Sequence, residues 1–340
     1  MTTTFPADER GVVGLEDPLK WGVLSTARIA ARLIEGARAS DVADVVAVGS
    51  RKLASARSFA DAHGIPRAHG SYDALLADPG VEAVYIPLPN SMHVDWTLRA
   101  LRAGKHVLCE KPMDRRPERV VEAFDAAAEA GLVLSEAFMW RHHPQTARLR
   151  SLLDGGVIGE LRLVRASFSF VLAGDSDVRL DPALDGGALM DVGCYCVSGA
   201  RLAAGGEPLS ISAQAVSGRS GVDTRMTGLL RFGGDVLATI DCAIDVVGRS
   251  ELELAGSRGR LLLADPWHGI APQIVLERGG ERELVEIELA DPYRLELDNM
   301  HAAVRGGHAP LLGRDDALGQ ARAIDALYRS AAEGRAVTLA

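Results

Sequence analysis

Lys111 follows directly after a short apolar run that predicts a buried strand. The run is His106–Cys109, and Glu110, Lys111 and Pro112 come next. Burying an ammonium group costs free energy unless it gains a partner, and strongly perturbed charged groups gather at functional sites. We therefore take Lys111 as a candidate catalytic residue.

A second segment holds a carboxylate and a phenol that lie four residues apart, Asp191 and Tyr195. Residues with this spacing share one face of a helix, and a helix is expected over Gly187–Ala203. Taken alone, Tyr195 would also fit a core position. Asp191 would fit a helix start, where the helix dipole favours a carboxylate. Together with Lys111, the two residues form a set that can bind a hydroxyl group and move its proton.

The stretch Trp21–Ala30 fits a strand that runs into a helix through a loop of small residues. A dinucleotide fingerprint has three glycines here, because the backbone must approach the pyrophosphate at the helix N-terminus. In this chain the three places hold Ser25, Ala27 and Ala30, and an ordinary strand-to-helix turn would look the same. The residues that would contact the pyrophosphate are Ser25, Thr26, Ala27, Arg28 and Ile29.

The residues at the end of the next predicted strand indicate whether the cofactor is NAD or NADP. NAD-binding proteins usually place a carboxylate there to bind the ribose hydroxyls, whereas this chain has Ser50, Arg51 and Lys52. A hydroxyl and two cations can form charge-assisted hydrogen bonds with a 2′-phosphate, although a solvated basic turn would have the same composition. The sequence therefore predicts NADP in preference to NAD.

With a nicotinamide at hand, the three candidate residues fit the chemistry of hydride transfer. Oxidation of a carbinol carbon requires that the hydroxyl proton leave as charge develops on oxygen. A tyrosine with a pKa of about 10 is a poor base at neutral pH, but a neighbouring ammonium and the oxidised nicotinamide would favour its phenolate. We predict that Tyr195 carries the proton with Lys111 as its electrostatic partner, and the opposite assignment stays open.

The elements that must position these groups follow a regular order in the first part of the chain. The predicted strands are Trp21–Leu24, Val45–Val48, Ala83–Leu88, His106–Cys109 and Leu132–Ser135. The predicted helices are Ala27–Ala37, Ala54–His63, Ser91–Ala103 and Pro117–Ala130. Strands that alternate with helices, without hairpin turns, predict a parallel sheet with right-handed crossovers. This is a Rossmann domain, with its nucleotide site at the carboxyl ends of the strands.

The pattern changes after about residue 156, where strands follow one another. They are predicted over Leu161–Phe170, Leu209–Val216, Met226–Phe232, Val236–Ile244, Glu251–Leu254, Arg260–Leu263, Ile274–Leu276 and Leu284–Leu289. Several alternate in polarity, which is typical of a sheet with one face in water. Two more helices are predicted over Pro292–Arg305 and Asp315–Ala332.

The predicted fold class is therefore α/β. Residues 1–20 form a tail, residues 21–140 a Rossmann NADP-binding domain, and residues 141–340 an α+β domain with a large, open, mostly antiparallel sheet.

Composition argues against several other classes of protein. A net charge of −9 disfavours nucleic-acid binding, which needs a basic face, and no run of about 18 apolar residues predicts a membrane span. The acidic N-terminal stretch does not resemble a secretory signal. The spacing of Cys109, Cys194, Cys196 and Cys242 fits neither a disulfide framework nor a zinc site. We expect a soluble, cytoplasmic protein with free thiols and no metal.

The motifs together resemble the glucose–fructose oxidoreductase / inositol dehydrogenase / rhizopine-catabolism (Gfo/Idh/MocA) family over about residues 21–335. The motifs are Glu110-Lys111-Pro112, the stretch Ile86–His93, the stretch Glu136–Pro144, and Asp191-Val192-Gly193-Cys194-Tyr195. Each motif is weak alone, but the combination is specific. The resemblance implies a Rossmann domain and a sheet domain that carries the substrate face and the interface of a homodimer or homotetramer.

The resemblance also implies roles for single residues. Lys111 matches the active-site lysine of the family. Tyr195 stands where many members have histidine, and Asp191 matches a helix carboxylate, as in the branch of glucose–fructose oxidoreductase, xylose dehydrogenase, dihydrodiol dehydrogenase and sugar 3-ketoreductases. Arg179 resembles an arginine near the nicotinamide and the substrate, so the implied substrate-binding set is Lys111, Arg179, Asp191 and Tyr195. The positions implied to line the cofactor are Leu88, Asn90, His93, Glu110, Lys111, Trp140 and Arg141. The loop without glycines departs from the family pattern.

The implied reaction transfers a hydride between the nicotinamide and a carbinol or carbonyl carbon of a sugar or sugar-derived substrate. An aldose dehydrogenase, a keto-sugar reductase and a trans-dihydrodiol dehydrogenase all fit. Two other classes also fit: a non-catalytic NAD(P)-binding sensor or regulator, and a redox-neutral, NAD-dependent glycosidase. Retention of both Lys111 and Tyr195 argues against a sensor that has lost its catalytic lysine. A co-purifying dinucleotide without net turnover would favour the glycosidase.

Overall fold

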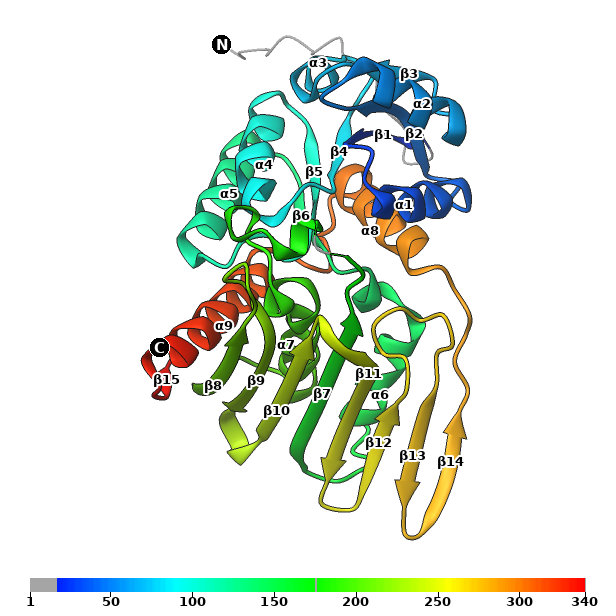
Figure 1. Cartoon of the computed structure of the whole chain (residues 1–340). Coiled ribbons are helices and arrows are strands. Elements are labelled where there is room, and N and C mark those ends of the chain that lie inside the picture. The colour runs from blue at the N-terminus through cyan, green and yellow to red at the C-terminus, as the bar shows by residue number, and fades with distance from the viewer. Residues whose placement is uncertain (1–16, 175, 340) are drawn as a thin grey trace, which may run out of the picture.

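The structure, a computed structural model, describes residues 17–174 and 176–339 and consists of two sheets joined by helices (Figure 1). One sheet has six strands in the order β3-β2-β1-β4-β5-β6, and the other has nine in the order β14-β13-β12-β11-β7-β10-β9-β8-β15. The predicted fold class is confirmed. Residues 1–16 of the predicted tail lie outside the described residues, and Leu19 and Lys20 belong to β1.

All neighbouring strands of the six-stranded sheet are parallel. The strands are β1 (Leu19–Leu24), β2 (Ala43–Gly49), β3 (Arg67–His69), β4 (Ala83–Ile86), β5 (His106–Glu110) and β6 (Leu134–Ala137). The helices that pack on the sheet are α1 (Arg28–Arg38), α2 (Leu53–His63), α3 (Tyr72–Leu76), α4 (His93–Arg102) and α5 (Pro117–Ala130). Every residue of β4 is buried, as expected for a central strand covered by helices on both faces.

The nine-stranded sheet is antiparallel except for one pair, β7 and β10. Its strands are β7 (Leu161–Val171), β8 (Ser210–Ser217), β9 (Asp223–Arg231), β10 (Leu237–Ala243), β11 (Asp245–Gly256), β12 (Gly259–Leu263), β13 (Ile274–Arg278), β14 (Glu281–Val285) and β15 (Val337–Thr338). Burial alternates along β9 because helices cover one face of the sheet and leave the other exposed (Figure 1).

The remaining helices tie the two sheets together. They are α6 (Pro144–Asp154), α7 (Cys194–Ala204), α8 (Pro292–Gly306) and α9 (Arg314–Glu333). Helix α7 packs on β7, whereas α8 packs on α1 and buries Leu297 and Met300 in the core of the first sheet. Helix α9 contacts both α5 and β8. The last part of the chain therefore fixes the first domain against the second.

Three local features differ from the sequence-based predictions. The helix expected over Gly187–Ala203 is divided into a π-helical turn, Leu189–Gly193, and α7. The unpredicted helix α6 begins with a proline in its first turn, and the His143 side chain accepts a hydrogen bond from the Gln145 amide, which is an ordinary helix start. The strand expected over Leu284–Leu289 ends at Val285, and Leu289 is exposed.

Within the described part of the chain, no helix is long and apolar enough to cross a membrane. No group of three histidine, cysteine, aspartate or glutamate side chains in these residues is arranged to hold a metal ion. The four cysteines are free and buried. Burial raises the pKa of the Cys194 thiol to about 12, so this thiol stays protonated near neutral pH.

Glu136 is a buried carboxyl group that should make stability depend on pH. Its side chain is 1% exposed; Oε1 accepts a hydrogen bond from the Met113 amide at 2.7 Å, and Oε2 has no partner among the described residues. Burial raises the pKa of Glu136 from 4.5 to about 8. The folded state therefore holds a proton that the unfolded state releases, and the stability this provides is present below pH 4.5 and is lost as the pH rises to about 8.

Replacing the carboxyl group with an amide removes this dependence. We expect Glu136→Gln to match the wild type in melting temperature at pH 5 and to exceed it at pH 9, by the equivalent of roughly a few kcal/mol in unfolding free energy. Thermal denaturation at the two pH values, with the exposed Glu122→Gln as the control, measures the difference. An equal shift at both pH values would contradict the assignment.

Candidate active site

The two domains enclose a cleft of about 850 Å³. The loops at the carboxyl ends of β1, β4 and β5 contribute Ala27, Arg28, Ile29, Leu88, Asn90, His93, Glu110 and Lys111. The second domain and α8 contribute Phe168, Phe170, Arg179, Asp191, Tyr195, His268, Ile270 and Tyr293. The structure thus places most of the candidate residues from the two halves of the chain around one space.

Lys111 lies at the end of β5 and reaches the second domain. Its Nζ donates a hydrogen bond to the backbone oxygen of Asp191 at 2.7 Å and lies 3.8 Å from the Asp191 Oδ1. The same nitrogen is 5.0 Å from the centroid of the Tyr195 ring. Burial alone would lower the pKa of Lys111, but nearby negative charge, including that of Asp191, raises it. The side chain is therefore an ammonium at neutral pH.

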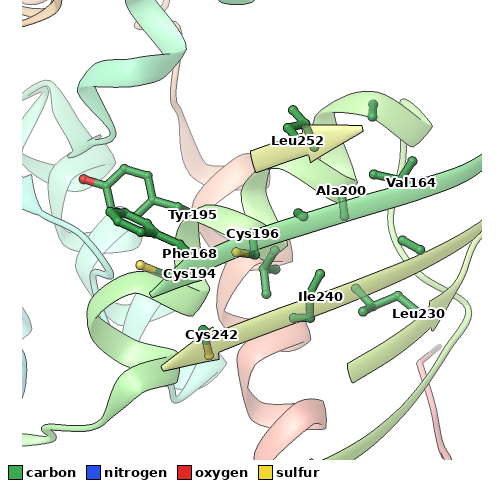
Figure 2. Packing of buried hydrophobic residues seen from close by; sticks show 14 of the residues in the cluster. Val164, Phe168, Cys194, Tyr195, Cys196, Ala200, Leu230, Ile240, Cys242 and Leu252 are labelled. Carbon is green, nitrogen blue, oxygen red and sulfur yellow. The ribbon is translucent and has the colours of Figure 1, made fainter. Parts of the chain in front are cut away.

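Tyr195 lies at the start of α7. Its ring packs in the hydrophobic core of the second domain, and its side chain also lines the cleft. The ring packs edge-on against Phe138 and Phe168, with centroid distances of 5.4 and 5.5 Å. In Figure 2 the hydroxyl points away from the other labelled side chains of the cluster. This hydroxyl makes no hydrogen bond to any residue that the structure describes. The position combines a fixed ring with a free polar group, as a proton carrier requires.

The protein groups around Tyr195 by themselves disfavour its phenolate. The sequence led us to expect that the neighbouring ammonium and the oxidised nicotinamide together favour the phenolate. Burial, followed by the charges of Glu110 and other acidic groups, raises the pKa of Tyr195 well above 10. The side chain is therefore a neutral phenol at neutral pH, suited to donate a proton rather than to accept one.

Asp191 is held between two cations. Arg179 Nε donates to Asp191 Oδ2 at 2.6 Å, and Arg179 also pairs with Asp177 at 3.2 Å. The loop that carries Arg179 approaches closely at Gly186, where a Cβ atom would lie 2.4 Å from the Arg179 carbonyl oxygen. The π-helical turn that contains Asp191 is a feature often found at functional sites. These contacts fix the carboxylate next to Lys111.

The loop between β1 and α1 retains the shape of a pyrophosphate site without its glycines. Ser25 has a φ of 140°, a conformation that favours glycine. Its hydroxyl donates to the Pro87 carbonyl oxygen at 3.2 Å and accepts from the Ala27 amide at 3.1 Å. No side chain of the described residues caps α1, so amides of its first turn are available to an anion. The residues present therefore fit a dinucleotide.

Some of the residues predicted to bind the cofactor lie beside the cleft and do not form part of its lining. Ser25, Thr26, Ser50, Arg51 and Lys52 do not line the cleft itself. Ser50 follows β2, whose last residue, Gly49, pairs with Leu24 of β1. Arg51 and Lys52 are exposed just beyond it. Ser50 to Lys52 are thus next to the loop between β1 and α1, at the same edge of the sheet.

Asn90 and His93 hold loops as well as lining the cleft. Asn90 Nδ2 donates to the backbone oxygen of Asp185 at 2.8 Å, across the two domains. The ring nitrogens of His93 lie 2.9 Å from the Pro112 oxygen and 2.7 Å from the Leu88 oxygen. Because both nitrogens of this buried ring contact the backbone, His93 positions the loops after β4 and β5.

Trp140 and Arg141 do not reach the cleft. Trp140 is 1% exposed and packs edge-on against Trp267, at 5.3 Å between ring centroids. Arg141 Nη1 is 3.2 Å from the Asp316 carboxylate. The neighbouring Met139 lines the cleft instead. Trp140 and Arg141 therefore lie behind the residues that line the cleft, because the short helical turn after β6 directs these two side chains into the second domain.

Several residues of the cleft were not predicted from the sequence. They are Arg32, Pro87, Pro89, Ala137, Met139, Phe168, Phe170, Ser176, Asp177, Val178, Leu184, Gly186, Gly187, Val192, His268, Ile270 and Tyr293. Most of them come from loops of the second domain, where spacing gives no indication of which residues meet. The Asp291 side chain, which caps α8, marks a helix start but not the position of Tyr293 in the cleft.

Comparisons with known proteins agree with this geometry. Residues 19–138 match the model of an oxidoreductase family with an NAD-binding Rossmann fold, GFO_IDH_MocA, and residues 146–262 match the GFO/IDH/MocA C-terminal domain. The chain is 39% identical to D-xylose 1-dehydrogenase (NADP(+)) 2 of Haloferax volcanii, over 94% of this chain and 100% of the relative.

Solved structures with the same architecture include two named oxidoreductases. A 3-ketoreductase from Actinomadura kijaniata, in complex with NADP and TDP-benzene, matches with a TM-score of 0.88 and 33% identity over 92% of this chain and 98% of its own. An aldose-aldose oxidoreductase from Caulobacter crescentus, in complex with glycerol, matches with a TM-score of 0.89 and 28% identity over 95% and 100%.

Proposed function

The chain belongs to the Gfo/Idh/MocA oxidoreductase family, and we propose that it transfers a hydride between NADP and a carbinol or carbonyl carbon of a sugar or sugar-derived substrate. One observation carries the proposal: the ammonium of Lys111 lies beside Asp191 and the Tyr195 ring in the cleft between the two domains. The named activities of the relatives, an NADP-dependent xylose dehydrogenase and a 3-ketoreductase, support the same class of reaction.

The residues that would hold NADP are those at the carboxyl edge of the six-stranded sheet. The loop from Ser25 to Ile29 would bind the pyrophosphate at the start of α1, and Ser50, Arg51 and Lys52 would bind the 2′-phosphate. Leu88, Asn90 and Glu110 line the cleft next to this loop. When bound, NADP supplies the hydride acceptor in oxidation and the hydride donor in reduction.

Side chains of the protein would transfer the proton to and from the substrate oxygen. In the reductive direction the neutral Tyr195 phenol donates its proton to the substrate oxygen, and the Lys111 ammonium stabilises the negative charge that develops there. In the oxidative direction the phenol must first lose its proton, so a higher pH favours oxidation. Asp191, fixed by Arg179 at 2.6 Å, keeps Lys111 in place and offers its carboxylate to a second hydroxyl.

A test of the proposal is the rate of nicotinamide reduction or oxidation with a panel of substrates. The panel contains free aldoses, a keto-sugar and a trans-dihydrodiol, each with NADP and with NAD. We expect turnover with at least one member and a preference for NADP. Absence of turnover with every member would contradict the proposal, and a dinucleotide that co-purifies without net turnover would favour a redox-neutral reaction.

The cofactor preference should depend on Arg51. We expect Arg51→Ala to raise the KM for NADP about 10- to 100-fold, because a charge-assisted hydrogen bond contributes about 1.5–3 kcal/mol, while the KM for NAD changes little. Initial rates with both cofactors measure this, and the exposed Arg57→Ala on α2 is the matched control. A similar change for the two cofactors would show that Arg51 does not contact the 2′-phosphate.

We also propose that the exposed face of the nine-stranded sheet forms a homo-oligomer interface. Leu163 of β7 pairs with Leu237 of β10, and both side chains are exposed, as is Leu229 of β9. An apolar sheet face of this kind usually marks an interaction site.

Light scattering is expected to give the mass of a dimer or tetramer, and Leu237→Asp is expected to shift the mass toward that of the monomer. A monomeric wild type would contradict the proposal. The control is Leu289→Asp, at an exposed residue outside the strands.

A further inference from the structure

The loop between β12 and β13 carries a histidine into the cleft. His268 and Ile270 both line the cleft, and the His268 ring packs on Phe168, which also packs on Tyr195. We propose that His268 is a specificity-determining residue that binds a hydroxyl group of an uncharged, polyhydroxylated substrate, away from the reacting carbon. This inference rests on the proposed function and narrows its substrate class.

The loop is built to hold a fixed conformation. Trp267 is fully buried, and its Nε1 donates to the Ser167 oxygen at 3.0 Å. Gln145 of α6 forms hydrogen bonds to both ends of the loop. Its Nε2 donates to the Asp265 backbone oxygen at 3.1 Å, and its Oε1 accepts from the Gln273 amide at 2.7 Å. A loop secured at its ends and at its centre can present a side chain in a defined position.

A carboxylate lies next to the His268 ring. Its Nδ1 lies 3.8 Å from Asp265 Oδ1, and Asp265 Oδ2 accepts from the amides of Ile270 at 3.0 Å and Ala271 at 3.2 Å. The turn continues through Gly269, whose φ is 65° and where a Cβ atom would lie 2.6 Å from the His143 ring. Nδ1 is thus the ring nitrogen placed beside the Asp265 carboxylate, and we assign Nε2, which has no hydrogen-bond partner among the described residues, to the ligand.

The position of His268 fits a sugar ring that reacts at Tyr195. The His268 ring packs edge-on against Phe168 at 5.4 Å between centroids, and Phe168 packs edge-on against Tyr195 at 5.5 Å. An apolar ring that contacts two side chains with polar groups suits a sugar, whose C–H faces pack on aromatic surfaces and whose hydroxyls need hydrogen-bond partners. A carbon at Tyr195 would place a hydroxyl on another part of the same molecule near His268.

The charges around His268 favour a hydroxyl over a phosphate. A phosphate site needs cations that are free to pair with it. Asp265 already offers its negative charge to His268. Contact with His268 and with backbone amides lowers the pKa of Asp265 to about 2, although burial acts in the opposite direction. Arg179, the arginine of the substrate side, already pairs with Asp177 and Asp191. The ligand that fits is therefore neutral.

A comparison of sugars that lack single hydroxyls tests the proposal. For the aldose that the wild type oxidises best with NADP, we expect His268→Ala to raise KM about 10- to 100-fold and to change kcat less than about threefold. His268→Gln, which keeps a hydrogen-bonding group, is expected to recover part of the loss. For one monodeoxy analogue, wild type and His268→Ala should have the same KM, because the hydroxyl that His268 binds is absent. Ile270→Ala, at the neighbouring residue of the same wall, is expected to affect all analogues alike.

Binding measured by calorimetry with the NADPH-loaded protein separates this inference from the proposed function. Sugar binding that weakens in His268→Ala would support the inference even if no sugar were turned over, in which case only the proposed reaction would fail. An equal loss for every analogue, an unchanged KM and affinity, or tighter binding of a phosphorylated sugar than of the free sugar would overturn the role of His268. Absence of any sugar binding by the wild type would overturn both proposals. Melting temperatures and NADP affinity verify that the variants are folded.

Discussion

Replacing Lys111 with alanine is expected to lower kcat by about 10³-fold or more while NADP still binds. The ammonium is the positive charge that contacts Asp191 at 2.7 Å and lies 5.0 Å from the Tyr195 ring. Removing a group that stabilises developing charge in a desolvated site typically costs 10²- to 10³-fold, and loss of general acid–base assistance costs a further factor of similar size. Single-turnover and steady-state rates with the best substrate measure the effect.

Two controls keep this result interpretable. Lys20→Ala, at an exposed lysine of β1, removes the same charge outside the cleft and should leave kcat unchanged. Lys111→Arg keeps the charge but not the point geometry of the ammonium, and is expected to recover only part of the rate. Turnover of Lys111→Ala within tenfold of the wild type would refute a catalytic role for this residue.

Replacing Tyr195 with phenylalanine is expected to reduce turnover about 10²- to 10⁴-fold, the range of general acid–base catalysis, without loss of stability. The ring keeps its contacts with Phe138 and Phe168. The hydroxyl that is lost has no hydrogen-bond partner within the described part of the chain, so its removal leaves no buried group unpaired. Melting temperature and kcat measured together distinguish a chemical role from a structural one.

The pH dependence of the wild type gives a second readout for Tyr195. Because burial holds the pKa of the phenol well above 10, the fraction of phenolate rises about tenfold per pH unit up to that value. The rate of oxidation should therefore increase with pH from 7 to 9 without a plateau, whereas reduction, which needs the neutral phenol, should be nearly constant. Tyr195→Phe should abolish the rise. Tyr293→Phe, a second tyrosine of the cleft, should retain it.

Much of the fold could be predicted because its elements have strong local signals. Helix α5 begins and ends where the sequence predicts, at Pro117 and Ala130, because a proline begins it and Gly131, in a left-handed conformation, ends it. Strand β3 and helix α3 were missed because they span only Arg67–His69 and Tyr72–Leu76, too short for a period to be visible. The π-helical turn before α7 has no local signal in sequence.

The candidate site could be predicted where single residues follow an element directly. Lys111 directly follows β5, and Asp191 and Tyr195 lie near the start of α7. The spacing predicted that Asp191 and Tyr195 share a helix face, and the family resemblance implied that they meet Lys111 in one site. Residues such as Phe168 and His268 come from strands and loops whose positions depend on the nine-stranded sheet as a whole. The pKa of Tyr195 could not be predicted either, because burial and nearby carboxylates act on it through tertiary contacts.

The central claim is that the ammonium of Lys111 and the phenol of Tyr195 act on the same substrate oxygen. A crystal structure with NADP and a bound sugar tests it most directly. The account predicts that one oxygen of the sugar lies within hydrogen-bond distance of both Lys111 Nζ and Tyr195 Oη, with its carbon facing the C4 atom of the nicotinamide. A sugar held by other groups, or either of these two side chains turned away from its reacting oxygen, would contradict the account.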